Sequence, residues 1–275
     1  MDDEISVIIR NKNDPNIWDC IASFRRVPRQ TFELIIVDSS GEPLDLDRLS
    51  LDISIRYVYE DISRFEALNI GVKMAQFNSV LIIDSDQIVS PVLVSELNRI
   101  DEEMCIIKER SYNRNFIGKI ADRQREFLYR YSKKHISDSL PVIPRFYRRE
   151  IIKRAISKLE RSELSLISQH EDSVIYSEVL KISRDVGFCD TPLLNIDPGF
   201  FHFARKSFRY GVAQAEALSS NCISKERADL LRSIDRNRII YSNPEGFNTG
   251  IFYEAIKAAF YIPGLMLGKL QGRHS

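Results

Sequence analysis

Four short runs of β-branched and other apolar residues, separated by segments with helical spacing, constrain how this chain can fold. The runs cover residues 5–9, 32–37, 53–59 and 80–83. Between them, residues 18–25 and 64–76 place apolar side chains along one side of a helix, and Pro91 opens a further helix, since proline is tolerated in the first helical turn. Strands that alternate with helices indicate βαβ units. We therefore predict an α/β fold with a Rossmann-like, mostly parallel central sheet flanked by helices.

Beyond about residue 104 the alternation is less regular. We predict a strand at residues 105–108 and helices at residues 116–134, 149–159 and 174–180. A loop or a short strand is expected at residues 191–198. The last clear element is an apolar segment at residues 252–270, which Pro263-Gly264 is expected to kink.

Composition limits the class of protein. The 275 residues suffice for one large domain or one domain with an appendage, and the formal net charge of zero gives no indication of a nucleic-acid partner. The cysteines are far apart and form no CxxC pair, which is typical of thiols in the reducing cytoplasm. We expect neither a secretory signal nor a clear membrane span, because the start lacks a basic region and no stretch of about 18 uninterrupted apolar residues occurs.

The apolar run Leu81-Ile82-Ile83 ends abruptly in Asp84-Ser85-Asp86. Ionised carboxylates are costly to bury unless they are paired or bind a cation. In an open α/β sheet, ligands usually bind at the carboxyl ends of the strands, where two aspartates can share a divalent ion that also binds phosphate oxygens. The motif therefore indicates a metal–diphosphate site. The alternative is an Asx-type turn in which Asp84 and Asp86 accept hydrogen bonds from backbone amides.

Several segments taken together resemble the family 2 glycosyltransferases, which have the nucleotide-sugar-binding GT-A fold. The similarity is strongest over about the first 100 residues and continues more weakly to about residue 215. The segments that carry it are residues 5–9 with Asn13, residues 33–40, 66–71 and 82–86, and further along residues 146–150 and Glu171-Asp172.

The resemblance implies roles for residues on the donor side. Asp38 would contact the nucleobase, because a carboxylate accepts from the uracil N3–H, although Asp38 could instead cap a turn. Asp84 and Asp86 would coordinate Mn²⁺ or Mg²⁺ through the donor diphosphate, with Ser85 between them also binding the donor. Arg64 and Asn69 would line the donor pocket, with a solvated position on the helix as the alternative for Arg64.

On the acceptor side, the resemblance implies that the catalytic base lies in the pair Glu171-Asp172. An acceptor hydroxyl is a poor nucleophile unless a positioned carboxylate takes its proton. We favour Asp172 as the base, with Glu171 binding the acceptor or capping the helix. The alternative is that both carboxylates only stabilise a helix N-terminus.

A basic and aromatic segment at residues 201–211 contains Arg205 and Arg209, whose guanidinium groups suit phosphate oxygens of the donor or of a lipid. His202 would be a further metal ligand, and its alternative is a packed core histidine. The chain departs from the family at Arg10-Asn11-Lys12, where relatives usually have a Pro-Thr-Tyr-like turn. It also lacks the usual glycine-rich lead-in before Glu171.

The apolar C-terminal segment and the basic residues around it suggest contact with a membrane surface. A kinked apolar helix suits the interface plane, and residues 108–134 contain nine Lys/Arg against three Asp/Glu, an excess that would attract anionic lipid. The alternative is that this segment covers a groove of its own domain or a second subunit. Membrane contact would imply a lipid-linked saccharide or polyprenyl phosphate as the acceptor, on the cytoplasmic face.

We predict a GT-A domain at residues 1–215, with a nucleotide-sugar-binding half at 1–100 and an acceptor-binding half at 101–215, followed by a helical region at 216–275. The predicted activity is metal-assisted, inverting transfer of a sugar from a UDP- or GDP-sugar to an acceptor hydroxyl. A nucleotidyltransferase would carry a glycine-rich loop after the first strand, and residues 10–13 contain no glycine. A non-catalytic binding protein on a degenerate GT-A fold is allowed by the atypical first turn but disfavoured by the intact aspartates.

Overall fold

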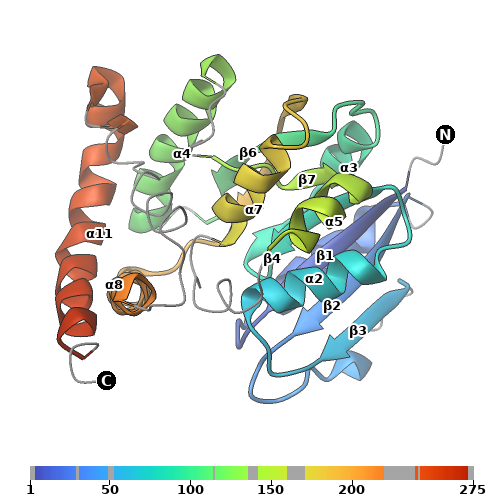
Figure 1. Cartoon of the computed structure of the whole chain (residues 1–275), viewed down its shortest axis with the longest axis horizontal. Coiled ribbons are helices and arrows are strands. Elements are labelled where there is room, and N and C mark those ends of the chain that lie inside the picture. Colours follow the sequence, from blue (N-terminus) through green and yellow to red (C-terminus); the bar gives the residue numbers. More distant parts are fainter. Residues whose placement is uncertain are drawn as a thin grey trace. The chain divides into compact units, whose positions relative to one another are not determined.

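The computed structural model of the chain is shown in Figure 1. It describes residues 4–28, 31–48, 53–113, 115–135, 142–159, 171–219, 239–240 and 242–271. Two compact units alternate along the sequence. The first comprises Met1–Lys108, Pro144–Lys158 and Glu178–Ile196, and the second comprises Glu109–Ile143, Leu159–Ser177 and Asp197–Ser275.

An eight-stranded sheet forms the centre of the first unit, in the order β3-β2-β1-β4-β7-β6-β8-β5. Its strands are β1 (Ile5–Asn11), β2 (Phe32–Asp38), β3 (Ile55–Tyr59), β4 (Ser79–Asp84), β5 (Gln87–Ile88), β6 (Met104–Ser111), β7 (Phe146–Arg148) and β8 (Val186–Asn195). Parallel pairing joins β3, β2, β1 and β4, whereas β7 pairs antiparallel with β4 and β6, and β5 pairs antiparallel with β8. These parallel pairings join the four strands at the β3 side of the sheet.

The register of the parallel strands sets where their polar ends lie. Every residue of β1 and β2 is buried, as expected for strands of a sheet covered on both faces. In this register Arg10 lies opposite Asp84, and Asn11 lies opposite Asp38. Because the strands run the same way, these polar residues line one edge of the sheet.

The helices of the first unit connect these strands. They are α1 (Ile17–Ser23), α2 (Arg64–Met74), α3 (Pro91–Leu97) and α5 (Arg149–Ser157), with 3₁₀ turns at Phe24–Arg26 and Leu46–Arg48. A capping box between Ser63 and Glu66 begins α2. A side chain at Gly71 of α2 would collide with Ile8 of β1, so glycine permits close packing of this helix on the sheet.

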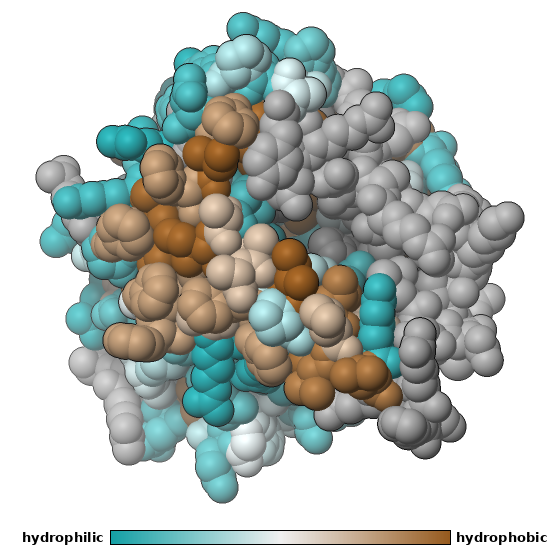
Figure 2. Space-filling view, turned by 90° about the vertical axis from the view of Figure 1, so that its left-hand side faces the viewer, coloured by the Kyte–Doolittle hydropathy of each residue, from teal (hydrophilic) through white to brown (hydrophobic). Residues whose placement is uncertain are grey.

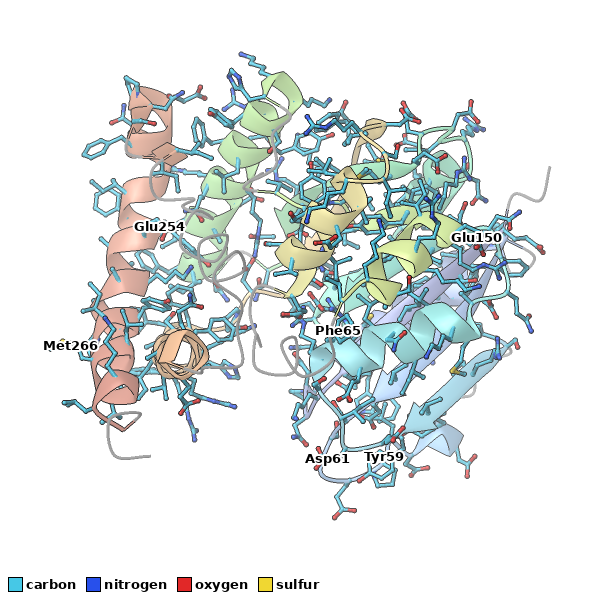
Figure 3. All side chains as sticks on the ribbon, in the orientation of Figure 1. Tyr59, Asp61, Phe65, Glu150, Glu254 and Met266 are labelled. Atoms are coloured by element: carbon cyan, nitrogen blue, oxygen red, sulfur yellow. The ribbon has the colours of Figure 1, made fainter. Side chains whose placement is uncertain are left out.

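Helices form most of the described second unit: α4 (Phe116–Lys134), α8 (Phe200–Ser219) and α11 (Pro244–Gln271), with α7 (Glu171–Leu180) running into the first unit. α11 packs along α8 and against α4. A Cβ at Gly211 or Gly264 would collide with the backbone of the facing helix, so these glycines permit a close helix pair. Glu254 of α11 faces α4 in Figure 3 and accepts a hydrogen bond of 2.6 Å from Gln124 Nε2.

Several predicted elements differ from the observed ones. The segment predicted as a loop or short strand is the ten-residue strand β8, because pairing with β5 and its place beside β6 stabilise an extended chain that its own composition does not favour. One helix, α11, continues through Pro263. By length and composition alone, its stretch Gly250–Leu270 could cross a membrane, which the sequence analysis did not anticipate.

Candidate active site

Polar side chains meet at the carboxyl edge of the parallel strands in the first unit. β1 contributes Arg10 and Asn11, β2 ends at Asp38, and β4 ends at Asp84. The apolar parts of these strands form the core, so the first polar residue of each strand lies where the buried stretch ends. This edge is where open α/β sheets place their ligands.

Asp84 binds three arginines from three different parts of the chain. Its Oδ1 lies 3.0 Å from Arg10 Nη2 and 2.8 Å from Arg64 Nη2, and its Oδ2 lies 3.2 Å from Arg145 Nη1. Arg64 is the first residue of α2, and Arg145 immediately precedes β7. Only Arg64 was predicted to belong to the site.

The residues after Asp84 form a closed turn. Asp84 N donates to Gln87 Oε1 at 2.9 Å, and Asp86 O accepts from Ile196 N at 2.7 Å. Ser85 is buried, and Asp86 is half-buried. The motif is therefore a turn that the backbone and Gln87 stabilise, and the Asp84 carboxylate binds guanidinium groups.

Asp38 is fully buried and accepts four hydrogen bonds. Its Oδ1 accepts from Asn11 Nδ2 (2.9 Å) and from Ser40 N (3.1 Å) and Oγ (2.5 Å), and its Oδ2 accepts from the Tyr57 hydroxyl (2.8 Å). Burial and the hydrogen bond to Asp38 raise the pKa of Tyr57 to about 12, although the hydrogen bond from Leu44 N acts in the opposite direction. The bond from Ser40 N forms the turn cap that was the alternative role for Asp38.

Two further residues at this edge were missed from the sequence. Asn11 is buried, and its Oδ1 lacks a hydrogen-bond partner within the part of the chain that the structure describes. Tyr59 is 43% exposed at the end of β3, and its hydroxyl donates to Gly41 O at 3.1 Å. Figure 3 shows Tyr59 and Asp61 where the chain leaves β3. Neither position carries a motif that a single sequence reveals.

The other predicted site residues lie in α2 and in the second unit. Asn69 is buried in α2. At the start of α7, Glu171 is buried and Asp172 is half-buried. His202, Arg205 and Arg209 are exposed on α8, and spacings of three and four residues place them on one helix face. His202 is therefore not a core residue, so that alternative is wrong.

The chemistry of the edge fits a divalent ion that arrives with a phosphate ligand. Asp84 and Asp86 offer hard oxygen donors, and Mg²⁺ is commonly bound through one or two carboxylates plus substrate phosphates. Within the described ranges, His, Cys, Asp and Glu residues do not gather in threes around a possible metal position. Both Asp84 oxygens already contact arginine, so Asp86 is the better candidate for the metal.

Comparison with known families decides which enzymes this chain belongs with. Residues 6–156, more than half of the chain, match the family described as glycosyl transferase family 2. The chain is a family 2 glycosyltransferase. The predicted family and enzyme class are thereby confirmed. The sequence has no match among curated proteins.

Solved structures of glycosyltransferases share the fold of this family 2 enzyme. TarS 1–349 of S. aureus in complex with UDP-GlcNAc is 13% identical, with a TM-score of 0.54 over 98% of this chain and 92% of that chain. The mannosyltransferase PcManGT of Pyrobaculum calidifontis, in complex with GDP-Man and Mn²⁺, is 17% identical, with a TM-score of 0.53 over 93% of this chain and 75% of that chain. The predicted GT-A fold is confirmed.

Proposed function

We propose that this family 2 enzyme transfers a sugar from a UDP- or GDP-sugar to an acceptor hydroxyl with inversion at the anomeric carbon. The observation that carries the proposal is the polar edge of the parallel sheet, where Asp84, Arg10, Arg64 and Arg145 meet on a chain of this family. Two enzymes with the same fold were solved with UDP-GlcNAc and GDP-Man, which supports a nucleotide-sugar donor here.

The donor residues act by binding and orientation. Asn11 Oδ1 is a buried acceptor beside Asp38, so these two residues can receive N–H groups of a nucleobase once the base displaces one of the present partners of Asp38. Asn69 of α2 and Ser85 belong to the same pocket in this proposal. Arg205 and Arg209, exposed on α8, supply guanidinium groups for a phosphate of the donor or of a lipid-linked acceptor.

A divalent ion, Mn²⁺ or Mg²⁺, would bind through Asp86 and the donor diphosphate, with Asp84 close by and His202 as a further candidate ligand. When bound, such an ion neutralises the negative charge that develops on the leaving nucleoside diphosphate. The solved complex of PcManGT with GDP-Man and Mn²⁺ supports a metal requirement. In this proposal Asp86 coordinates the metal ion, whereas Asp84 forms ion pairs with Arg10, Arg64 and Arg145.

Asp172 is the proposed general base. The acceptor oxygen forms a bond to the anomeric carbon while the bond from that carbon to the β-phosphate oxygen breaks. The bonding electron pair leaves with the nucleoside diphosphate, and the hydroxyl proton passes to Asp172. Glu171, which is buried next to it, serves to bind the acceptor or to begin α7.

Release of nucleoside diphosphate tests this function. We would incubate the protein with UDP-GlcNAc, UDP-glucose and GDP-mannose in Mn²⁺, with and without lipid-linked acceptors, and measure UDP or GDP formed. We expect release from one donor that requires the metal and is lost in Asp86→Asn. Binding without turnover of any donor, with or without acceptor, would contradict the assignment as an active transferase.

An exposed apolar surface on the second unit supports a peripheral membrane contact. Along α11, the exposed large apolar side chains are Phe247, Phe252, Ile262, Met266, Leu267 and Leu270, and Phe200 and Phe201 of α8 are exposed as well. Figure 2 shows apolar side chains gathered on the face that carries α11, and Met266 points outward in Figure 3. An exposed apolar patch of this kind marks an interaction surface.

The contacts on the opposite face of α11 favour a position of this helix in the membrane interface rather than across the bilayer. Glu254 is buried and bonded to Gln124, and Gly264 packs on α8. A spanning α11 would lose these contacts or would take the exposed cations of α8 into hydrocarbon, which is costly. Exposed Lys269, Arg205 and Arg209 can instead attract anionic headgroups. The acceptor in this proposal is lipid-linked.

Co-sedimentation with liposomes tests the membrane contact. We expect the protein to bind vesicles that contain anionic lipid and to bind several-fold more weakly as Met266→Glu, because a charge on the apolar face opposes insertion. Val92→Glu is the matched control, since Val92 is 58% exposed on α3 of the first unit and Met266 is 62% exposed. Equal vesicle binding by wild type and both variants would contradict the proposed face.

A further inference from the structure

A single buried side chain, Gln87, closes the turn that carries Asp84 and Asp86. Gln87 lies in the two-residue strand β5 and is 1% exposed. Its Oε1 accepts from Asp84 N at 2.9 Å, and its Nε2 donates to Asn195 Oδ1 at 2.9 Å. Both ends of the amide are thus bonded, which a buried amide needs to offset the loss of its hydration. The side chain joins the start of the turn to the end of β8.

The backbone beside Gln87 is held by few hydrogen bonds. β5 pairs with β8 over two residues only, one of which is the Gln87–Asn195 pair. Asp86 comes just before this short ladder, and its O accepts from Ile196 N at 2.7 Å. Pairing at the end of a ladder opens at a low free-energy cost unless other contacts support it. The side-chain bond between Gln87 and Asn195 supplies such support one residue from Asp86.

The turn brings together two carboxylates, which makes its shape costly to hold. Asp84 and Asp86 are separated by one residue, and like charges at short range repel each other. Gln87 contributes hydrogen bonds but no charge. It reaches the turn through the backbone N of Asp84, and the bond from Ile196 uses the backbone O of Asp86. These bonds therefore hold the turn without using a carboxylate oxygen.

We propose that Gln87 is a positioning residue for the metal-assisted transfer: it holds the turn in the shape in which Asp86 coordinates the divalent ion, before that ion and the donor bind. This inference rests on the proposed function and deepens it, because it adds Gln87, with Asn195 as its partner. Residues that orient a metal ligand commonly contribute about 10- to 100-fold to metal affinity. A turn that already has its shape also avoids the free-energy cost of ordering on binding.

The competing explanation is that Gln87 only stabilises the fold. Under that explanation, its removal lowers the free energy of unfolding and leaves the effect of the metal on nucleotide binding unchanged. A positioning role instead weakens nucleotide binding in Mn²⁺ and nearly preserves binding without metal, because the nucleotide alone does not use Asp86. The ratio of the nucleotide affinities in Mn²⁺ and in EDTA, which we call the Mn²⁺ gain, separates the two explanations.

Isothermal titration calorimetry with UDP and GDP, in EDTA and at one Mn²⁺ concentration below saturation, measures the Mn²⁺ gain. Gln87→Met removes both hydrogen bonds and keeps an unbranched, flexible side chain. We expect wild type to show a gain for one nucleotide, and we expect this gain to fall by about 10-fold in Gln87→Met. Affinity in EDTA should stay within about 2-fold of wild type, since contacts away from the metal are independent of Gln87.

A second variant tests the same bond from its other side. Gln87→Met should fold, because Ser23 Oγ of α1 accepts from Val89 N at 3.1 Å and holds the same segment. Asn195→Ala removes the acceptor for Gln87 Nε2 and should lower the Mn²⁺ gain in the same direction. Because Gln87 acts through Asn195, the double variant should reduce the gain by less than the product of the two single reductions.

The matched control is Gln124→Met in the second unit. Gln124 is also buried, and its Nε2 donates to Glu254 Oε1 at 2.6 Å. The control therefore removes a buried glutamine amide from a hydrogen bond, as Gln87→Met does. It should lower thermal stability and keep the full Mn²⁺ gain.

The possible results separate this inference from the proposed function. A full Mn²⁺ gain in both Gln87→Met and Asn195→Ala would overturn the inference and leave the proposed function standing. Equal weakening in EDTA and in Mn²⁺ would also overturn it, because the donor pocket as a whole would then have changed. Sugar transfer by a wild type whose nucleotide binding does not respond to Mn²⁺ would overturn the inference together with the metal requirement. Absence of nucleotide binding by wild type would contradict both the inference and the proposed function.

Discussion

At the scale of single residues, Asp84 makes contacts that its motif does not suggest. Its carboxylate holds Arg10, Arg64 and Arg145, so its removal would leave three guanidinium groups close together without their shared counter-ion. Breaking a buried ion pair on one side is much more costly than losing an exposed one. A change at Asp86 keeps Asp84 and its contacts with the three arginines, so Asp86 is the position at which we would probe the metal.

We predict that Asp84→Ala lowers the free energy of unfolding by about 1–3 kcal/mol, because repulsion among the buried Arg10 and the more exposed Arg64 and Arg145 replaces attraction to Asp84. Urea denaturation of wild type and variant measures this difference. Asp86→Asn is the control, and its stability should stay within about 0.5 kcal/mol of wild type. An Asp84→Ala protein as stable as wild type would contradict the arginine contacts.

These residue contacts also show where inference from sequence ends. The identities of Asp38, Asp84 and Asp86 follow from short apolar runs that end in carboxylates, which is a local pattern. The Arg10–Asp84 pair depends on the register between β1 and β4, which are 74 residues apart at this contact. Tyr57 reaches Asp38 only because β3 pairs with β2. Pairings over such distances are not encoded in any one segment.

At the scale of elements, the strongly periodic segments were predictable, and those defined by their neighbours were not. The helix predicted at residues 116–134 is α4 with the same bounds, because an amphipathic pattern sustained over many turns is specific. β8 has no such pattern and depends on pairing with β5 and on its place beside β6 in the sheet.

The basic character of α4 and the strand before it also changes meaning in the structure. Arg110 forms two hydrogen bonds of 2.7 Å with Asp122, and Arg125 forms two with Asp197. Part of the positive charge predicted to attract lipid is thus neutralised within the second unit. Exposed cations on α8 and α11 are better candidates for that attraction.

The Arg110–Asp122 pair gives α4 a measurable pH dependence. Burial opposes ionisation of Asp122, but hydrogen bonds from Arg110 and Ser111 outweigh it and hold the pKa of Asp122 below its ordinary value. A lowered folded-state pKa contributes stability above the unfolded-state pKa of about 3.9, and this contribution is lost as pH falls through the folded-state value. Arg110 is 41% exposed, so solvent screening keeps the contribution small.

We therefore expect Asp122→Asn to lower the free energy of unfolding by about 1 kcal/mol at pH 7. The difference from wild type should shrink as the pH falls below 4, because the wild-type carboxylate then becomes protonated too. Chemical denaturation at pH 7 and at pH 3 measures both differences. A difference that is equal at the two pH values would show that the pair does not act through ionisation.

At the scale of the whole molecule, the aspartates proposed to bind the nucleotide and the metal belong to a different unit from the proposed base. Asp84, Asp86 and Asp38 lie in the first unit, and Glu171 and Asp172 lie in the second. Donor binding and acceptor activation should therefore be separable by mutation. The surface proposed to contact the membrane also belongs to the second unit, as does the proposed base, which is consistent with the proposal that the acceptor is carried by lipid.

We predict that Asp172→Asn lowers the transfer rate by at least about 100-fold, because general-base catalysis commonly contributes 10²- to 10⁴-fold. Its affinity for nucleoside diphosphate should stay within about 2-fold of wild type. Transfer assays and calorimetry on the same preparation measure the two effects. Normal turnover in Asp172→Asn, with a large loss in Glu171→Gln, would move the base to Glu171.

The most direct test of the central claim, that the first unit binds a nucleotide-sugar donor at the edge formed by Asp84 and Asp86, is a thermal-shift screen. The screen would compare UDP, GDP and their sugars, with and without Mn²⁺, on wild type and Asp86→Asn. We predict that one nucleotide stabilises wild type, since a ligand that binds only the folded state raises its stability, and that Mn²⁺ increases this shift in wild type but not in Asp86→Asn. Absence of a shift with every nucleotide, in the presence of Mn²⁺ and anionic vesicles, would contradict a donor site at this edge.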